Sequence, residues 1–282
     1  MFEATTHDIY EADSRDLSFL ADESVHLVVT SPPYAALKRY EDHPSQLGHI
    51  EDYEDFLVEL DKVWSQCARV LVPGGRIVCV VGDVCVSRRR GGRHHVLPLS
   101  ADIQVRARGY GLDVLTPIRW LKVANIKLEA SSSSRFLGKP NLPNGVVKND
   151  LEHILFLRKP GYRKPTPEME AASRIETEQY MEWFCPVWKV RGASTREHPA
   201  PFPAEIASRL VRMFSFVGDT VLDPFAGTGT TNLAALETGR NSIGVEIEPT
   251  YVDLIERRFA EIPIGHEVRI VRADTPEPAV AA

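Results

Sequence analysis

Two short segments of this 282-residue chain carry side chains whose types and spacing could do chemistry. The first, Thr30-Ser31-Pro32-Pro33-Tyr34, follows an apolar run, and ligands of open α/β sheets bind where such strands end. Pro32 and Pro33 fix the backbone and remove two N–H donors, which leaves the local carbonyls as acceptors. A serine hydroxyl and a fixed carbonyl can both accept from an amine, and Tyr34 offers a flat face for an extruded base. This segment predicts a site that activates an amine, with an ordinary proline turn as the alternative.

The second segment runs from Thr220 to Thr231 with the sequence TVLDPFAGTGTT, which predicts a strand, a glycine loop and the start of a helix. Glycines let the backbone approach a ligand closely, and the first helical turn offers unpaired N–H donors. Glu246 lies nineteen residues past Gly227, at the end of the next expected strand, where an acid can bind two ribose hydroxyls. We therefore expect a nucleoside cofactor to contact Asp223, Pro224, Phe225, Ala226, Gly227, Thr228, Gly229, Thr230, Thr231 and Glu246.

Two features of this loop favour S-adenosylmethionine over NAD as the cofactor. Asn232 stands where the dinucleotide fingerprint G-x-G-x-x-G has its third glycine. Asp223, directly before the loop, would repel a pyrophosphate but suits the ammonium of a methionine moiety. The alternative is a tight turn that closes an α/β unit, with Glu246 as a surface acid, and the density of specialised residues disfavours it.

Apolar β-branched runs alternate with segments of helical period, which predicts an α/β fold with a largely parallel sheet. Strands are expected at 25–30, 76–81, 112–121, 152–158, 220–222 and 242–245, and helices at 53–71, 99–108, 203–215, 229–238 and 250–261. Residues 73–75, Pro-Gly-Gly, are expected to form a turn. The stretch from about 160 to 198 has no sustained period, so we interpret it as an insertion or small subdomain.

Composition and cysteine usage exclude several classes of protein. The chain is 43% hydrophobic and 26% charged, which is ordinary for a globular domain. Its acidic first residues do not resemble a secretory signal, and no apolar run reaches membrane-spanning length, so we expect a cytoplasmic protein without a membrane partner. The four cysteines are scattered without a C-x-x-C pair, which argues against a disulfide framework and against a metal site.

The formal net charge of −6 conceals a strong segregation of charge along the chain. Residues 86–164 hold 16 Lys and Arg against 5 Asp and Glu, a balance of +11, so the remainder carries −17. A basic surface on an acidic scaffold is suited to contact phosphates, although blocks of one sign also form ordinary solvated faces. The charge pattern permits nucleic-acid binding without requiring it.

Taken together, the two segments resemble those of the amino methyltransferases of bacterial, archaeal and phage DNA. Residues 30–34 resemble the catalytic motif of that family, residues 223–231 its cofactor loop, and Glu246 its ribose-binding acid. The resemblance extends to His198, Pro199 and Phe202, in a segment that helps hold the methionine end of the cofactor. It also includes Asp13, in an element whose acid lies near the adenine ring, although the family more often has glycine where Ala12 stands. The catalytic motif precedes the cofactor loop, which is the β arrangement.

Membership would imply a Rossmann-like methyltransferase fold: a mostly parallel seven-stranded sheet with a reversed edge strand and helices on both faces. It would also imply that the amine of a flipped-out base attacks the methyl group of S-adenosylmethionine directly, without a covalent enzyme intermediate. Methylation at cytosine C5 needs a thiolate, typically in a Pro-Cys motif, and this chain has only Cys185-Pro186. Ser31 indicates site-specific transfer to the exocyclic N4 of cytosine.

Three alternative functions stay open at this point. The first is an adenine-N6 methyltransferase on the same scaffold, but such enzymes usually have Asp at the position of Ser31. The second is a methyltransferase that acts on a protein glutamine or on RNA, and the glutamine enzymes have Asn at that position. The third alternative is a DNA-binding module that has lost catalysis. The presence of Ser31, Tyr34, Asp223 and Glu246 weighs against that loss.

Two basic segments are candidates for contacting double-stranded DNA, the expected substrate. Residues 87–95 form a glycine-hinged basic loop, and residues 131–141 combine Ser, Arg and Asn side chains, although a solvated turn and a linker are the respective alternatives. The expected contacts are Arg88, Arg89, Arg90, Arg93, Arg135 and Lys139. A cognate restriction endonuclease, a homodimer and association with the nucleoid of a prokaryotic or phage-infected cell complete the expected partners.

These expectations divide the chain into four parts. Residues 1–159 are the catalytic half of the methyltransferase domain, 160–198 a target-recognition insertion, and 199–264 the cofactor-binding half of the same domain. Residues 265–282 form a C-terminal extension, whose last residues, TPEPAVAA, have too little apolar content to become ordered.

Overall fold

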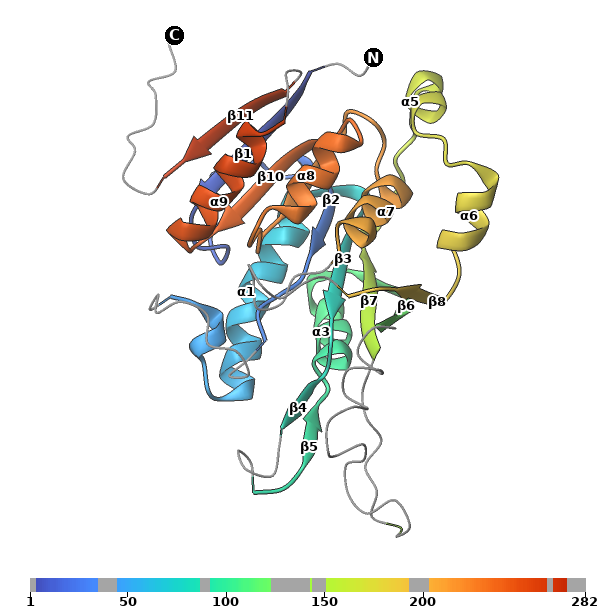
Figure 1. The fold of residues 1–282 in the computed structure, drawn as a ribbon. Helices are drawn as coiled ribbons and strands as arrows, with labels where there is room; N and C mark the ends of the chain where they lie inside the picture. The colour runs from blue at the N-terminus through green and yellow to red at the C-terminus, as the bar shows by residue number, and fades with distance from the viewer. Residues whose placement is uncertain are drawn as a thin grey trace.

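A nine-stranded, mostly parallel sheet with helices on both faces forms the protein (Figure 1). The computed structural model describes residues 4–34, 45–86, 92–122, 143, 151–192, 203–262 and 266–272. The strand order is β11-β1-β10-β9-β2-β3-β7-β6-β8. The expected α/β class and parallel character are therefore confirmed.

The strands and helices have the following bounds. The strands of the large sheet are β1 (Thr5–Glu11), β2 (Val25–Thr30), β3 (Leu71–Val81), β6 (Asp113–Lys122), β7 (Leu151–Arg158), β8 (Val187–Val190), β9 (Thr220–Asp223), β10 (Asn241–Glu246) and β11 (His266–Val271). The helices are α1 (Tyr53–Val70), α3 (Leu99–Ala107), α5 (Pro167–Ala172), α6 (Thr177–Trp183), α7 (Ala204–Phe214), α8 (Thr230–Glu237) and α9 (Pro249–Ala260), with short 3-10 turns η1 (Leu47–His49) and η2 (Arg108–Tyr110).

The expected number of seven strands and the expected reversed edge strand are both wrong. β7 is the reversed strand, antiparallel to β3 on one side and to β6 on the other, so it lies inside the sheet. Two further strands extend the edges: β8 pairs with β6, and β11 pairs with β1, both in parallel. β8 comes from the stretch 160–198 and has four residues, and β11 comes from the C-terminal extension and contains polar residues.

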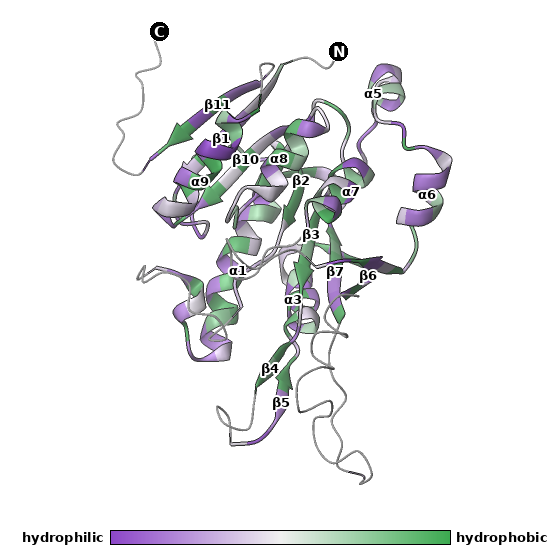
Figure 2. Cartoon of the chain, viewed as in Figure 1, coloured by the Kyte–Doolittle hydropathy of each residue, from purple (hydrophilic) through white to green (hydrophobic). Residues whose placement is uncertain are grey.

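Two large apolar cores lie on opposite faces of the sheet, and a smaller third cluster packs α9 against β1. On one face, α1 and α3 pack against the strands, and α1 does so with the apolar spacing that the sequence shows. Asp52 caps the start of α1 by accepting from the backbone N–H of Asp55 at 3.0 Å. α7 and α8 cover the other face. Figure 2 shows the central strands β2 and β3 largely in the apolar colour, as expected of strands buried on both faces.

The residues expected to form a turn at 73–75 lie inside β3. The pairing of β2 with β3 shifts register there, from Val25 opposite Leu71 to Leu27 opposite Arg76. Gly74 has a φ of +81° and donates its N–H to the carbonyl of Lys159 at 3.0 Å. The Pro-Gly-Gly sequence therefore produces an irregular bulge that keeps the strand continuous, because the neighbouring β7 supplies partners for the bulged backbone.

The stretch 160–198 contains α5, α6 and β8; α5 lies at the amino end of β9, and α6 packs against α7 through Glu182 with Arg209 and Gln179 with Arg212. Ser173 Oγ accepts from the N–H of Val217 at 2.8 Å, and Arg163 pairs with Asp219, one residue before β9 begins. β8 runs parallel to β6, so its last residue reaches the opposite edge of the sheet. α5 and the end of β8 consequently lie at different edges of the sheet.

A small antiparallel pair, β4 (Val84–Val86) and β5 (His95–Leu97), extends from the end of β3 (Figure 1). It encloses the segment that the sequence identifies as a basic loop. No helix among the described residues combines the length and the apolar character that a membrane span requires.

Candidate active site

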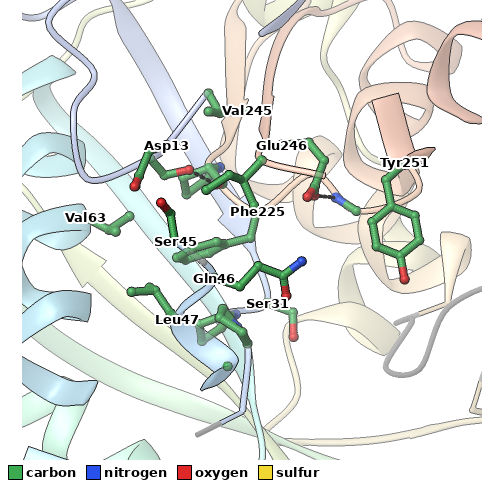
Figure 3. A pocket seen from close by; sticks show the side chains of 17 residues that line it. Asp13, Ser31, Ser45, Gln46, Leu47, Val63, Phe225, Val245, Glu246 and Tyr251 are labelled. Carbon is green, nitrogen blue, oxygen red and sulfur yellow. Dashed lines mark hydrogen bonds between the residues drawn. The ribbon is translucent and has the colours of Figure 1, made fainter. Parts of the chain in front are cut away.

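A partly open cavity lies at the carboxyl ends of β1, β2, β9 and β10 (Figure 3). It brings together the two segments that the sequence singles out, because the ends of parallel neighbouring strands meet at one edge of the sheet. The cavity is lined by Asp13, Ser14, Ser31, Pro32, Pro33, Ser45, Gln46, Leu47, Gly48, Val63, Pro224, Phe225, Gly227, Val245, Glu246, Ile247 and Tyr251.

The loop between β9 and α8 depends on glycine at two positions. Gly227 and Gly229 have φ angles of +52° and +76°, which L side chains rarely adopt. A Cβ at Gly229 would also meet Cγ1 of Ile255 at 3.0 Å. The loop can therefore turn sharply into α8 and leave the first N–H groups of the helix available to a ligand.

Glu246 ends β10 and faces the cavity with both oxygens held by the backbone. Its Oε2 accepts from the N–H of Gly227 at 2.7 Å, and its Oε1 accepts from the N–H of Glu248 at 3.0 Å. Burial raises the pKa of Glu246 to about 7, although these backbone donors act in the opposite direction. Each carboxylate oxygen has a second lone pair, so the group can accept two more hydrogen bonds from a vicinal diol.

Asn232 of α8 stands where a dinucleotide fingerprint would have glycine. Its neighbours explain how α8 still packs closely on β10. Its buried side chain donates to Ser242 Oγ at 3.1 Å. A Cβ at Gly244, on the facing strand, would meet Asn232 Oδ1 at 2.9 Å. The glycine that permits close helix–strand contact thus stands on β10 instead of α8.

Asp13 lies on the cavity wall just after β1, and Arg15 fixes its carboxylate. Arg15 Nε donates to both Asp13 oxygens at 3.0 Å, while its terminal nitrogens contact Glu59 of α1 and the carbonyl of Ser45. Ser14, next to Asp13, donates to the carbonyl of Pro224. These contacts join the end of β1 to the cofactor loop and to the segment before α1.

Asp223 takes a different position from the residues around it, because it does not line the described cavity. Its side chain is 2% exposed, and its Oδ1 accepts from Thr30 Oγ1 at 2.6 Å and from the N–H of Phe225 at 3.0 Å. Burial raises the pKa of Asp223 to about 6, and the hydrogen bonds from Thr30 and from the N–H of Phe225 limit that rise. The carboxyl group lies behind the loop, toward the catalytic strand.

Ser31 and the two prolines line the cavity, and the partly buried ring of Tyr34 packs against the apolar core. The hydroxyl of Tyr34 accepts from the N–H of Gly82 at 3.1 Å, at the carboxyl end of β3. The hydroxyl contact fixes the far end of the ring.

Several expected site residues lie outside the described residues. These are His198, Pro199, Phe202, Arg88, Arg89, Arg90, Arg135 and Lys139. Arg93 is described and is exposed at the start of β5. Conversely, sequence reasoning missed Ser45, Gln46, Leu47, Val63 and Tyr251, which line the cavity. Nothing in their local sequence marks them, apart from the helical period that assigns Val63 to the buried face of α1.

With the geometry in place, comparison with known proteins decides the family. The profile of the N6/N4 DNA methylase family matches residues 25–257. The chain belongs to this family. As a family member, it is a DNA methyltransferase that uses S-adenosylmethionine.

Individual relatives agree with this assignment. The methyltransferase is 38% identical to the Type II methyltransferase M.MthZI of Methanothermobacter thermautotrophicus, over 94% of this chain and 79% of the relative. A candidate DNA modification methylase of Thermus thermophilus, solved in complex with S-adenosyl-L-methionine, superposes with a TM-score of 0.79 at 48% identity, covering 96% of this chain and all of that one. The cytosine-N4-specific PvuII DNA methyltransferase, at 21% identity and a TM-score of 0.68 over 95% of this chain and 96% of that one, shares the fold.

Proposed function

We propose that this methyltransferase transfers a methyl group from S-adenosylmethionine to the exocyclic N4 of cytosine in a flipped-out base of a specific DNA site. The observation that carries the proposal is the position of Ser31. The residue before Pro32 lines the cavity with a hydroxyl and not with a carboxylate, and the same cavity is lined by Gly227 of the glycine loop and by Glu246. Adenine-N6 transfer on the same scaffold is the second candidate, and Ser31 disfavours it.

The residues of the cavity fit the proposed cofactor. Glu246 accepts the ribose hydroxyls, and the backbone of the loop around Gly227 approaches the ligand closely. Asp13, oriented by Arg15, accepts from the adenine amine. His198, Pro199 and Phe202 contact the methionine end in this proposal, and Asp223 contributes negative charge from behind the loop. When bound, the cofactor supplies an electrophilic methyl group.

At the reacting centre, two acceptors orient the base. The hydroxyl of Ser31 and the carbonyl of Pro32 accept from the exocyclic amine, so that its lone pair is drawn out of conjugation. Tyr34, held through its hydroxyl by Gly82, provides the surface on which the base stacks. The amine would then attack the methyl group directly, without a covalent enzyme intermediate, and the proton that it loses would pass to solvent.

The proposed DNA surface follows from the edge at which the cavity opens. Lys122, Val81 and Val190 end β6, β3 and β8 at that edge, and the basic stretch 86–164 includes the chain that follows the first two. We place phosphate contacts on Arg88, Arg89, Arg90, Arg93, Arg135 and Lys139. Double-stranded DNA, a cognate restriction endonuclease and a homodimer are the proposed partners.

Two parts of the insertion at 160–198 are candidates for recognising the DNA sequence: the helices α5 and α6, and the chain that follows β8. α5 lies at the amino end of β9, α6 packs on α7, and the segment that they span, residues 167–183, has five acids against one arginine. That charge repels phosphate, and that edge is opposite the cavity. Within the insertion, we therefore assign recognition to the chain that follows β8.

Tritium transfer from labelled S-adenosylmethionine to unmethylated duplex DNA tests the proposal. We expect transfer by the wild type and a loss on the order of 10²-fold in rate for Ser31→Ala, with cofactor affinity retained, because one positioned contact to the transition state is removed. Ser24→Ala, on the surface before β2, is the matched control and should be fully active. Absence of transfer to any duplex by the folded wild type would contradict the proposal.

A further inference from the structure

The catalytic strand and the cofactor strand are joined by few backbone hydrogen bonds. β2 and β9 pair in register at Leu27 with Val221 and at Val28 with Leu222. The residues proposed to do chemistry come later on each strand: Ser31 follows Thr30, and the loop follows Asp223. Past the paired positions the two strands must separate to open the cavity, so other contacts have to set the distance between them.

Side-chain hydrogen bonds join the end of β2 to the end of β9 and to the start of α8. Thr30 Oγ1 donates to Asp223 Oδ1 at 2.6 Å, and both residues are buried, at 0% and 2% exposure. Thr231, in the first turn of α8, donates to the carbonyl of Val29 at 3.2 Å. Asp223 Oδ1 also accepts from the N–H of Phe225, whose residue lines the cavity. One carboxylate oxygen thus holds the residue before Ser31 and the start of the loop together.

We propose that Thr30 and Asp223 form a latch that fixes the position of Ser31 relative to the cofactor loop, with Thr30 acting as a positioning residue for methyl transfer. The proposal rests on the proposed function in using Ser31 as the acceptor of the amine. Direct displacement requires the attacking nitrogen and the methyl carbon to be aligned within a short distance, so a small separation of the two strands lowers the rate steeply. Binding of the cofactor depends on the loop and Glu246. Asp223 keeps its hydrogen bond from the N–H of Phe225 when the Thr30 hydroxyl is removed, and Glu246 keeps its hydrogen bond from the N–H of Gly227, so we expect the loop to retain its conformation.

This assignment predicts a pH effect as well as a rate effect. The groups that face the Asp223 carboxyl are Thr30, Thr231, the Cys67 thiol of α1, the Cys79 thiol of β3 and the Glu246 carboxyl of β10. Both thiols stay protonated because burial raises the pKa of each. The hydrogen bond from Thr30 lowers the pKa of Asp223, so removal of the hydroxyl raises that pKa further above about 6.

The experiment compares Thr30→Val, which keeps the shape of the side chain but lacks the donor, with Thr30→Ser, which keeps the donor. The maximal rate is measured from pH 5 to 9 with saturating cofactor and DNA, and cofactor affinity is measured by calorimetry. With saturating cofactor, protonation of Glu246, which acts on cofactor binding, does not affect the measured rate. The pH profile then reports the protonation of Asp223. Thr238→Val, which removes a hydroxyl that donates to the carbonyl of Ala234 at the end of α8, is the matched control.

We expect Thr30→Val to lose about tenfold or more in maximal rate, with cofactor affinity within about twofold of wild type. Its rate should also begin to fall at a higher pH than in the wild type as the medium is acidified. Thr30→Ser should recover most of the rate and the wild-type pH profile, and Thr238→Val should change neither.

A Thr30→Val enzyme with an unchanged rate and pH profile would overturn the latch, and so would a parallel loss of cofactor affinity. If that variant does not fold, the pH profile of Thr30→Ala is compared with that of Thr30→Ser in the same way. Formation of N6-methyladenine by the wild type would refute the proposed base but not the latch, since the latch concerns the rate on whichever amine is used.

Discussion

The N–H of Gly227 donates to Oε2 of Glu246 at 2.7 Å, so the cofactor loop after β9 and the acid that ends β10 are in direct contact. The contact orients the carboxylate before any ligand is bound, and the group lines the cavity. Two consequences of this arrangement can be measured.

Cofactor affinity should depend on the protonation of Glu246. Burial raises the pKa of this carboxyl from 4.5 to about 7, and only the ionised form offers all its lone pairs to the ribose hydroxyls. Affinity should therefore fall as the pH is lowered from 8 to 6. Glu246→Ala should weaken binding about tenfold or more, since the loss of paired hydroxyl contacts costs on the order of 1–3 kcal/mol. Calorimetry across this range checks both effects, and an unchanged affinity in a folded variant would refute the assignment.

The same group should destabilise the ligand-free fold at alkaline pH. A carboxyl whose folded pKa is raised stabilises the fold below its unfolded pKa, near 4.5, and that contribution is lost as the pH rises to about 7. In Glu246→Gln, which does not titrate, the free energy of unfolding should decline less between pH 4.5 and 7 than in the wild type. Urea denaturation at a series of pH values provides the comparison, and identical slopes would show that Glu246 has an ordinary pKa.

Tyr34 should act through its ring and, to a smaller degree, through its hydroxyl. Tyr34→Phe keeps the stacking face but loses the bond from Gly82, so a loss of a few-fold in kcat/KM for DNA is expected, since a neutral hydrogen bond contributes about 1 kcal/mol. Tyr34→Ala removes the platform as well and should lose more, about 1–3 kcal/mol in stacking on the base. Steady-state kinetics on one duplex compares the two variants. Equal losses in both would show that the ring face has no part in holding the base.

The basic loop between β4 and β5 should bind phosphates. Replacement of Arg88, Arg89 and Arg90 with Ala should reduce the slope of log K against log salt by up to about 0.9 for each phosphate that the variant no longer neutralises. Arg174→Ala, a change between α5 and α6 at the opposite edge of the sheet, should leave the slope unchanged. Salt titrations of DNA affinity separate the two cases. If the triple variant keeps both slope and affinity, the loop is a solvated turn.

Elements with a strong local signal could be predicted from the sequence. The apolar spacing of residues 53–71 predicted α1, and the run at 76–81 predicted the buried part of β3, because both patterns reflect burial against one continuous core. β8 and β11 were missed. β8 is four residues long, and β11 alternates charged with apolar residues, so their pairing depends on the free edges that β6 and β1 offer.

The candidate site shows the same division. Ser31, Gly227 and Glu246 each follow or end an expected strand, so the sequence predicted that they share one site. All three line one cavity. The side-chain direction of Asp223 could not be predicted, because it depends on Thr30, from a strand 193 residues away along the chain. Ser45 and Tyr251 reach the cavity through tertiary packing alone, without a local motif.

The identity of the methylated amine is the central claim, and mass spectrometry of nucleosides tests it most directly. The gene is expressed in a host that lacks its own N4-cytosine and N6-adenine methyltransferases, with Ser31→Ala as the control, and the digested DNA is analysed. Because the proposed acceptors of the amine are the hydroxyl of Ser31 and the carbonyl of Pro32, residues that line the cavity, we predict N4-methylcytosine in the wild-type sample and a strong reduction in the control. N6-methyladenine in place of N4-methylcytosine would contradict the account, and would show that Ser31 does not select the base.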